Sequence, residues 1–93
     1  MIQGFACRET ERIHHGEISR RLPPAIQSTA RRKLRQLDAA TDLDFLRIPP
    51  GNRLEALRGD RAGQHSIRIN DQYRLCFRWD GEHAHAVEST DYH

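Results

Sequence analysis

The most regular hydrophobic pattern lies between residues 22 and 40, where apolar side chains recur at steps of three and four. This spacing places them on one stripe of an α-helix. Two prolines at the start favour a helix that begins at Pro23-Pro24 and runs to about Ala40, because the fixed φ of proline suits the first turn. The stripe is expected to cover a sheet and consists of Leu22, Ile26, Ala30, Leu34 and Leu37.

A second pattern, with a period of two, marks the hairpin predicted over residues 65–69 and 72–79. Asn70 and Asp71 tolerate the positive φ of a tight hairpin turn and are predicted to join the strands. Successive side chains of a strand point to opposite faces. One face is therefore apolar, with Tyr73, Leu75, Phe77 and Trp79, and the other carries Arg68, Arg74 and Arg78.

The remaining elements are predicted from shorter signals. Residues 2–7 suit a weak first strand, and residues 9–15 a helix that ends at Gly16. Residues 41–52 are predicted to form a loop, and residues 53–58 a strand. Asp80-Gly81 is predicted to begin a turn into a last strand that runs through about Ser89. This order predicts an α+β fold, with two N-terminal helices packed on a mostly antiparallel sheet. The 93 residues suffice for one domain, spanning 1–93.

Composition excludes several classes of protein. No apolar run approaches the roughly 20 residues of a membrane span, and no signal pattern opens the chain, so no membrane partner and a cytoplasmic location are expected. Because the cytoplasm is reducing, Cys7 and Cys76 are expected to be free thiols. His14 and His15 are adjacent, so they point in different directions on a helix. No metal and no cofactor are predicted.

The charge distribution is more informative than the formal net charge of +2. Residues 1–37 hold eight basic and three acidic side chains, whereas residues 80–93 hold four acidic and no basic ones. This asymmetry suits a basic surface that faces phosphates, with acid kept to a rim. Solvated faces are the simpler explanation of any single charged run. Both interpretations stay open for the helical cations Arg31, Arg32, Lys33 and Arg35.

Four segments together resemble the HigB-type toxins of the RelE/ParE superfamily. They are residues 37–41 (LDAAT), 57–63 (LRGDRAG) and 73–77 (YRLCF), and the terminal Asp91-Tyr92-His93. The resemblance covers nearly the whole chain. It implies a microbial-ribonuclease-like (RelE-like) fold and an endonuclease that cleaves mRNA on the ribosome.

The resemblance also implies a partner and a set of site residues. The partner is a helix-turn-helix antitoxin of the HigA type, and the pair represses its own promoter, so operator DNA is reached only through the antitoxin. By position, the active site is lined by Arg58, Arg74, Asp91, Tyr92 and His93. Glu55 stands where relatives often carry a histidine, which leaves the general base undetermined.

These residues can supply metal-free RNA cleavage, in which a ribose 2′-hydroxyl attacks the neighbouring phosphate. Arg74 would stabilise the transition state, since guanidinium binds two phosphate oxygens at once. Either Glu55 or Asp91 would accept the proton, and either His93 or Tyr92 would protonate the leaving oxygen, unless Tyr92 stacks on a base. The phosphate-binding residues would be Arg53, Arg58, Arg68 and Arg78. Glu55 has the equally plain alternative of a salt bridge to Arg53 or Arg74.

Two other function classes compete with the nuclease. A poison that blocks DNA gyrase, as in another branch of the superfamily, needs the fold but not the terminal tripeptide. A nonenzymatic nucleic-acid-binding module would use the basic residues of 20–35 and the arginine face, and predicts salt-sensitive binding without cleavage. The 6% aromatic content counts against that module, because single strands stack on aromatic rings.

Overall fold

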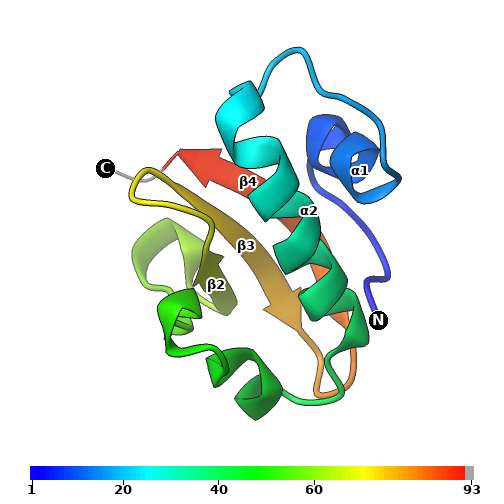
Figure 1. Ribbon diagram of the computed structural model, residues 1–93. Helices are drawn as coiled ribbons and strands as arrows, with labels where there is room; N and C mark the ends of the chain where they lie inside the picture. The colour runs from blue at the N-terminus through cyan, green and yellow to red at the C-terminus, as the bar shows by residue number, and fades with distance from the viewer. Residues whose placement is uncertain (92–93) are drawn as a thin grey trace.

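A computed structural model describes residues 1–91 and shows two helices on one face of a four-stranded sheet (Figure 1). Helix α1 spans Arg8–His14 and α2 spans Pro24–Ala39. The strands are β1 (Glu55–Ala56), β2 (Gln64–Arg68), β3 (Tyr73–Trp79) and β4 (Ala84–Asp91). They lie in the order β1-β2-β3-β4, with every neighbouring pair antiparallel. The predicted α+β class is confirmed.

The apolar stripe of α2 forms the core with the inner face of the sheet. Ile26, Ala30, Leu34 and Leu37 are buried, and Leu22 packs against them just before the helix. Helix α2 crosses β3 and β4, with α1 beside it (Figure 1). From the sheet, the core receives Ile67, Leu75, Phe77 and Val87. Within residues 1–91, neither helix is long and apolar enough to cross a membrane.

The hairpin forms as predicted, but its turn is built differently. Asn70 and Asp71 do not have positive φ. Instead, the Asn70 side-chain oxygen accepts hydrogen bonds from the backbone N–H groups of Gln72, at 2.9 Å, and Tyr73, at 2.7 Å. An asparagine side chain that bonds its own backbone two and three residues on closes a turn without a left-handed residue.

The predicted first strand is only partly present. Ile2 and Phe5 form isolated parallel bridges with Ala84 and Val87 along the free edge of β4. Between those two β4 positions, Ala86 has a φ of 52°, which interrupts the ladder. The prediction of a regular strand over residues 2–7 is therefore wrong, although the segment lies where a fifth strand would.

The strand predicted over residues 53–58 shrinks to Glu55–Ala56. Arg53 adopts the left-handed conformation, with a φ of 47°, and Arg58 already caps the 3₁₀-helix η3 (Gly59–Arg61). The predicted loop before it holds the 3₁₀-helices η1 (Leu43–Arg47) and η2 (Pro50–Asn52). The strand is short because turns begin on both sides of it.

Asn52 joins these turns to α2. The side chain is fully buried, and its amide nitrogen donates to the Gln36 side chain at 3.0 Å and to the Leu46 carbonyl at 3.1 Å. Its oxygen accepts from Lys33. Burial, followed by the charges of Arg32 and Arg68, lowers the pKa of Lys33. Lys33 therefore has a structural role and is not simply a solvated cation on the surface of α2.

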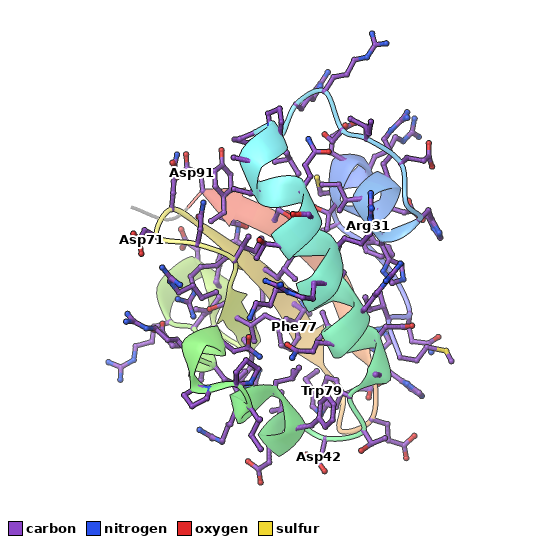
Figure 2. The ribbon with its side chains drawn as sticks, in the orientation of Figure 1. Arg31, Asp42, Asp71, Phe77, Trp79 and Asp91 are labelled. Atoms are coloured by element: carbon purple, nitrogen blue, oxygen red, sulfur yellow. The ribbon has the colours of Figure 1, made fainter. Side chains whose placement is uncertain are left out.

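Of the other three cations on α2, one has a structural contact and two are exposed. Arg31 is half-buried, and its Nε donates to the Ile13 carbonyl of α1 at 3.2 Å. Figure 2 shows Arg31 on the side of α2 that faces α1. Arg32 and Arg35 are exposed. Two of the four cations thus connect α2 to its neighbours.

Replacing Leu34 by alanine tests the core. Leu34 is fully buried, so Leu34→Ala is expected to lower the free energy of unfolding by about 3 kcal/mol, through lost transfer energy and a residual cavity. Ile18 is 78% exposed, and Ile18→Ala should change it by less than about 0.5 kcal/mol. Denaturant titration measures both, and a loss below about 1 kcal/mol for Leu34→Ala would contradict this core.

Asp80 makes stability depend on pH through the β3–β4 turn. A hydrogen bond to His85, at 2.7 Å, and the backbone N–H groups of Glu82 and His83 hold the pKa of Asp80 well below its usual range. A lowered folded-state pKa contributes stability above the unfolded pKa of about 4, and this contribution is lost as the pH falls further.

We therefore expect Asp80→Asn to lower the melting temperature at about pH 6, and the gap from the unmodified protein to shrink as the pH falls to about 2.5. Thermal unfolding followed by circular dichroism measures the gap. Because both proteins share every other carboxylate, their difference isolates Asp80. A gap that stays constant over this range would show that the Asp80 hydrogen bonds do not favour its charged form.

Candidate functional site

Arg74 lies at the centre of the outer face of the sheet, the face that α2 does not cover. Strand alternation places Leu75 in the core and Arg74 on the other side. The Nε of Arg74 donates to the Ser66 hydroxyl at 2.7 Å, and its Nη2 donates to the Arg53 carbonyl at 2.6 Å. The Arg74 side chain is only 11% exposed. The guanidinium is therefore held in one orientation before any ligand arrives.

The third nitrogen of Arg74 remains available. Within residues 1–91, Nη1 has no hydrogen-bond partner, while Nε and Nη2 are both engaged. A guanidinium carries five N–H donors in a rigid plane. Arg74 can thus bind an anion through Nη1 without losing the contacts that orient it.

Glu55 stands beside this arginine. It is the cross-strand partner of Ser66, and its Oε1 lies 3.9 Å from Arg74 Nη2, with the side chain 54% exposed. A distance of 3.9 Å is near the outer limit for an ion pair, whereas the hydrogen bonds from Arg74 to Ser66 and Arg53 are short. Ser66 and Arg53 therefore hold Arg74 more closely than Glu55 does, and the Glu55 carboxylate is accessible.

A second arginine–glutamate pair lies on the same face. Arg61 Nη1 is 2.7 Å from Glu88 Oε1 and 3.1 Å from the Gln64 side-chain oxygen. Glu88 is opposite Cys76, two pairs along the strands from Arg74 and Thr90 and so on the same face. Cys76 is a free thiol and fully buried, although strand alternation directs it to this face.

The other predicted cations are distributed along this face. Arg68 is the cross-strand partner of Arg74, but it forms an ion pair with the exposed Asp71, which offsets its charge. Arg78 is exposed at the far end of β3, opposite Gln64. Arg58 is exposed at the start of η3, and within residues 1–91 its side chain makes no hydrogen bond or ion pair. Arg53 contributes its carbonyl to Arg74 and is itself exposed.

Asp91 is placed differently from the prediction. It pairs with Tyr73, an inward-facing residue, so alternation directs it away from the face of Arg74. Its carboxylate accepts from the Gln72 side chain at 3.0 Å, and Figure 2 shows Asp91 and Asp71 at the same edge of the molecule. The structure therefore brings Glu55, and not Asp91, beside Arg74. Tyr92 and His93 lie outside the described residues.

No group of three or more histidine, cysteine, aspartate or glutamate side chains within residues 1–91 could hold a metal ion. The neighbouring histidines have other contacts: the His14 ring lies 5.6 Å from that of Phe5, and His15 pairs with Glu11 at 3.8 Å. What the outer face offers is one fixed guanidinium, that of Arg74, with exposed arginines on the same face and the Glu55 carboxylate beside it.

Comparison with known proteins places this arrangement in a family. Residues 4–93 match the family model of the HigB-like toxins, described as RelE-like toxins of the type II toxin–antitoxin system HigB. The chain therefore belongs to the HigB-like toxin family. It is a RelE-like toxin of a type II toxin–antitoxin system.

One named relative supports this assignment, and a solved structure shows the same fold. The chain is 53% identical over 80 residues to toxin HigB-1 of Vibrio cholerae, covering 85% of this chain and 84% of that protein. It is 33% identical over 66 residues to an uncharacterised protein of Haemophilus influenzae, covering 71% and 65%. A YoeB–YefM complex from Staphylococcus aureus matches in fold, with a TM-score of 0.60, 19% identity and coverage of 100% and 98%.

Four elements of this HigB-like toxin's outer face were not predicted from its sequence. They are the Ser66 hydroxyl, the Arg53 carbonyl, and the Arg61 and Glu88 side chains. Period-two alternation could have placed Ser66 on the face of Arg68, two pairs along the strands from Arg74. The Arg53 carbonyl carries no sequence signal, because its position depends on a left-handed residue that is not glycine.

Proposed function

We propose that this HigB-like toxin cleaves translated mRNA on the ribosome by attack of a ribose 2′-hydroxyl on the adjacent phosphate, without a metal ion. The single observation that carries the proposal is the fixed Arg74 guanidinium, whose Nη1 is unengaged on the outer face. Donors held in place before the reaction stabilise developing charge without reorganisation. Arg74 is proposed to stabilise the negative charge that develops around the pentavalent phosphorus in the transition state.

Glu55 is the general base of this proposal. In the step, the 2′-oxygen bonds to phosphorus while Glu55 takes its proton, and the bond to the 5′-oxygen breaks with a proton delivered to that oxygen. The products are a 2′,3′-cyclic phosphate and a 5′-hydroxyl. The half-exposed Glu55 side chain is accessible to substrate. The proton donor is proposed from the family resemblance alone, as His93 or Tyr92.

The remaining arginines are proposed to hold the flanking phosphates. Arg58 is exposed at one edge of the face, and Arg53 and Arg78 are exposed as well. Arg68 would first have to exchange its Asp71 partner for phosphate. The Arg74 guanidinium, 3.9 Å from Glu55, also offsets the repulsion between this carboxylate and the substrate phosphate. Ribosome dependence places the activity in the cytoplasm.

The partner is proposed to be a helix-turn-helix antitoxin of the HigA type, which neutralises the toxin and carries the pair to operator DNA. The solved structure of similar fold holds its toxin together with YefM. An exposed cationic face is suited to storage under a protein partner of opposite charge.

Replacing Arg74 tests the nuclease. Arg74→Ala removes the positioned guanidinium and is expected to lower mRNA cleavage about 10²- to 10³-fold, as loss of one transition-state donor does elsewhere. Arg74→Lys keeps the charge without the planar fork and should restore only part of the activity. Mapping of mRNA 5′-ends after induction measures cleavage, and circular dichroism confirms that each variant folds.

The control is Arg47→Ala, which removes an exposed arginine paired with Asp44 on η1 and should cut like the unmodified toxin. Cuts within translated frames that vanish in Arg74→Ala and persist in Arg47→Ala support the proposal. Growth arrest with intact mRNA and with DNA damage would instead identify a gyrase poison. Salt-sensitive RNA binding without cleavage would identify a binding module.

Co-expression tests the partner. The product of a neighbouring helix-turn-helix gene is expected to co-purify with the tagged toxin and to abolish the growth arrest that the toxin alone causes. The inactive Arg74→Ala toxin serves as the matched control, because it should bind the antitoxin without needing neutralisation. Failure of both toxins to retain this protein on the affinity column would contradict a HigA-type partner.

A further inference from the structure

We propose that Arg61 is a positioning residue, which fixes the turn over residues 58–63 to β4 and so holds Arg58 at the edge of the outer face of the sheet. The inference rests on the proposed function, because Arg58 is assigned there to phosphate binding. Arg61 itself has no assigned role in that function. Its contacts within the fold are what indicate one.

The guanidinium of Arg61 joins two strands that are not neighbours. It contacts the Gln64 side chain of β2 at 3.1 Å, and Glu88 and Thr90 of β4 at 2.7 and 3.5 Å. Strand β3 lies between β2 and β4, so the side chain spans β3 on its outer face. Such a contact connects the turn that carries Arg61 to the far strand of the sheet.

The burial of Cys76 supports this arrangement. Cys76 is opposite both Ser66 and Glu88, in the middle of the spanned strand, and is fully buried although α2 covers only the other face. The Arg61 and Glu88 side chains are 30% and 26% exposed. Because the pair is partly desolvated and the contact is short, it holds more firmly than a fully exposed ion pair.

The turn needs such an anchor. Gly59 and Gly63 bracket it, with φ of 64° and 90°, and glycine adopts many other conformations at little cost. On one side of Arg58, Leu57 is buried and its N–H donates to the Gln64 carbonyl at 2.9 Å. On the other side, Arg61 provides the side-chain anchor to the sheet. Arg58 is thus held between two fixed points while its own side chain stays exposed.

The alternative is that Arg61 contacts RNA directly, with Glu88 as a competitor for its charge. The two roles predict opposite effects of Glu88→Gln. If Arg61 binds phosphate, removing the competing charge raises cleavage. If Arg61 is an anchor, Glu88→Gln replaces a charge-assisted contact by a weaker one and lowers cleavage.

A double-mutant cycle tests the proposal. Purified full-length Arg58→Ala, Arg61→Ala and the double variant are compared with the unmodified toxin in a translation reaction with a defined mRNA. Arg61→Ala alone is expected to slow cleavage about ten- to a hundredfold, as misplaced binding groups do. In the Arg58→Ala background it should add no more than about a twofold loss, because Arg61 acts through Arg58.

The control is Arg12→Ala, which removes an arginine of α1 that pairs with Glu9 at 3.5 Å and with Glu17 at 3.7 Å. It should leave cleavage unchanged. Losses that multiply in the Arg58, Arg61 double variant, or faster cleavage by Glu88→Gln, would overturn the inference. A general loss of folding cannot imitate the expected result, because it would also slow cleavage in the Arg58→Ala background.

Amide hydrogen exchange provides a readout that does not need activity. Arg61→Ala and Glu88→Ala should each speed exchange in residues 58–63 and leave residues 73–79 as protected as in the unmodified toxin. Unchanged exchange in residues 58–63 would overturn the inference. Absence of cleavage by the unmodified toxin would reject the proposed function, while this measurement would still decide whether the anchor exists.

Discussion

The outer face of the sheet depends on one constraint, the burial of α2 against the other side of the sheet. Because Leu75 must face Leu34 and its neighbours in the core, strand alternation leaves Arg74 no position except the outer face. A slip of one residue in β3 would turn Arg74 inward and expose the apolar residues. The packing energy of the helix therefore also fixes the placement of the proposed catalytic cation, although the helix lies on the opposite face.

A mostly buried guanidinium needs acceptors, and this need shapes the neighbouring backbone. Arg74 obtains one acceptor from Ser66 on the adjacent strand and another from the carbonyl of Arg53. Arg53 is left-handed, a conformation that costs a non-glycine residue about 1 kcal/mol or more. The hydrogen bond to a charged donor offsets such a cost. The same backbone turn accounts for the brevity of β1, since the chain reaches the sheet only at Glu55.

The sequence predicted whatever depended on periodicity. The α2 stripe follows from apolar residues at steps of three and four. The hairpin strands and the outward direction of Arg74 follow from alternation at steps of two. Both periods can be read from residues that are close together in the sequence. The Asn70 turn, the left-handed Arg53 and the displaced Asp91 were not predictable, because each depends on local backbone geometry. Arg61 lay within a recognised motif, but its role depends on β4, far along the chain. The sequence pattern contains no information about such a contact.

The two arginine–glutamate pairs show how one face can hold carboxylates among cations. The Arg61–Glu88 contact is short and about one-quarter exposed, so that carboxylate is committed to structure. Glu55 is more than half exposed and lies 3.9 Å from an arginine whose orientation is set by other groups. Because Ser66 and Arg53 already orient Arg74, a ligand can approach the Glu55 carboxylate without disturbing that arginine. The fold thus uses one glutamate to hold an arginine and leaves the other exposed, which is why the proposed general base is Glu55 and not Glu88.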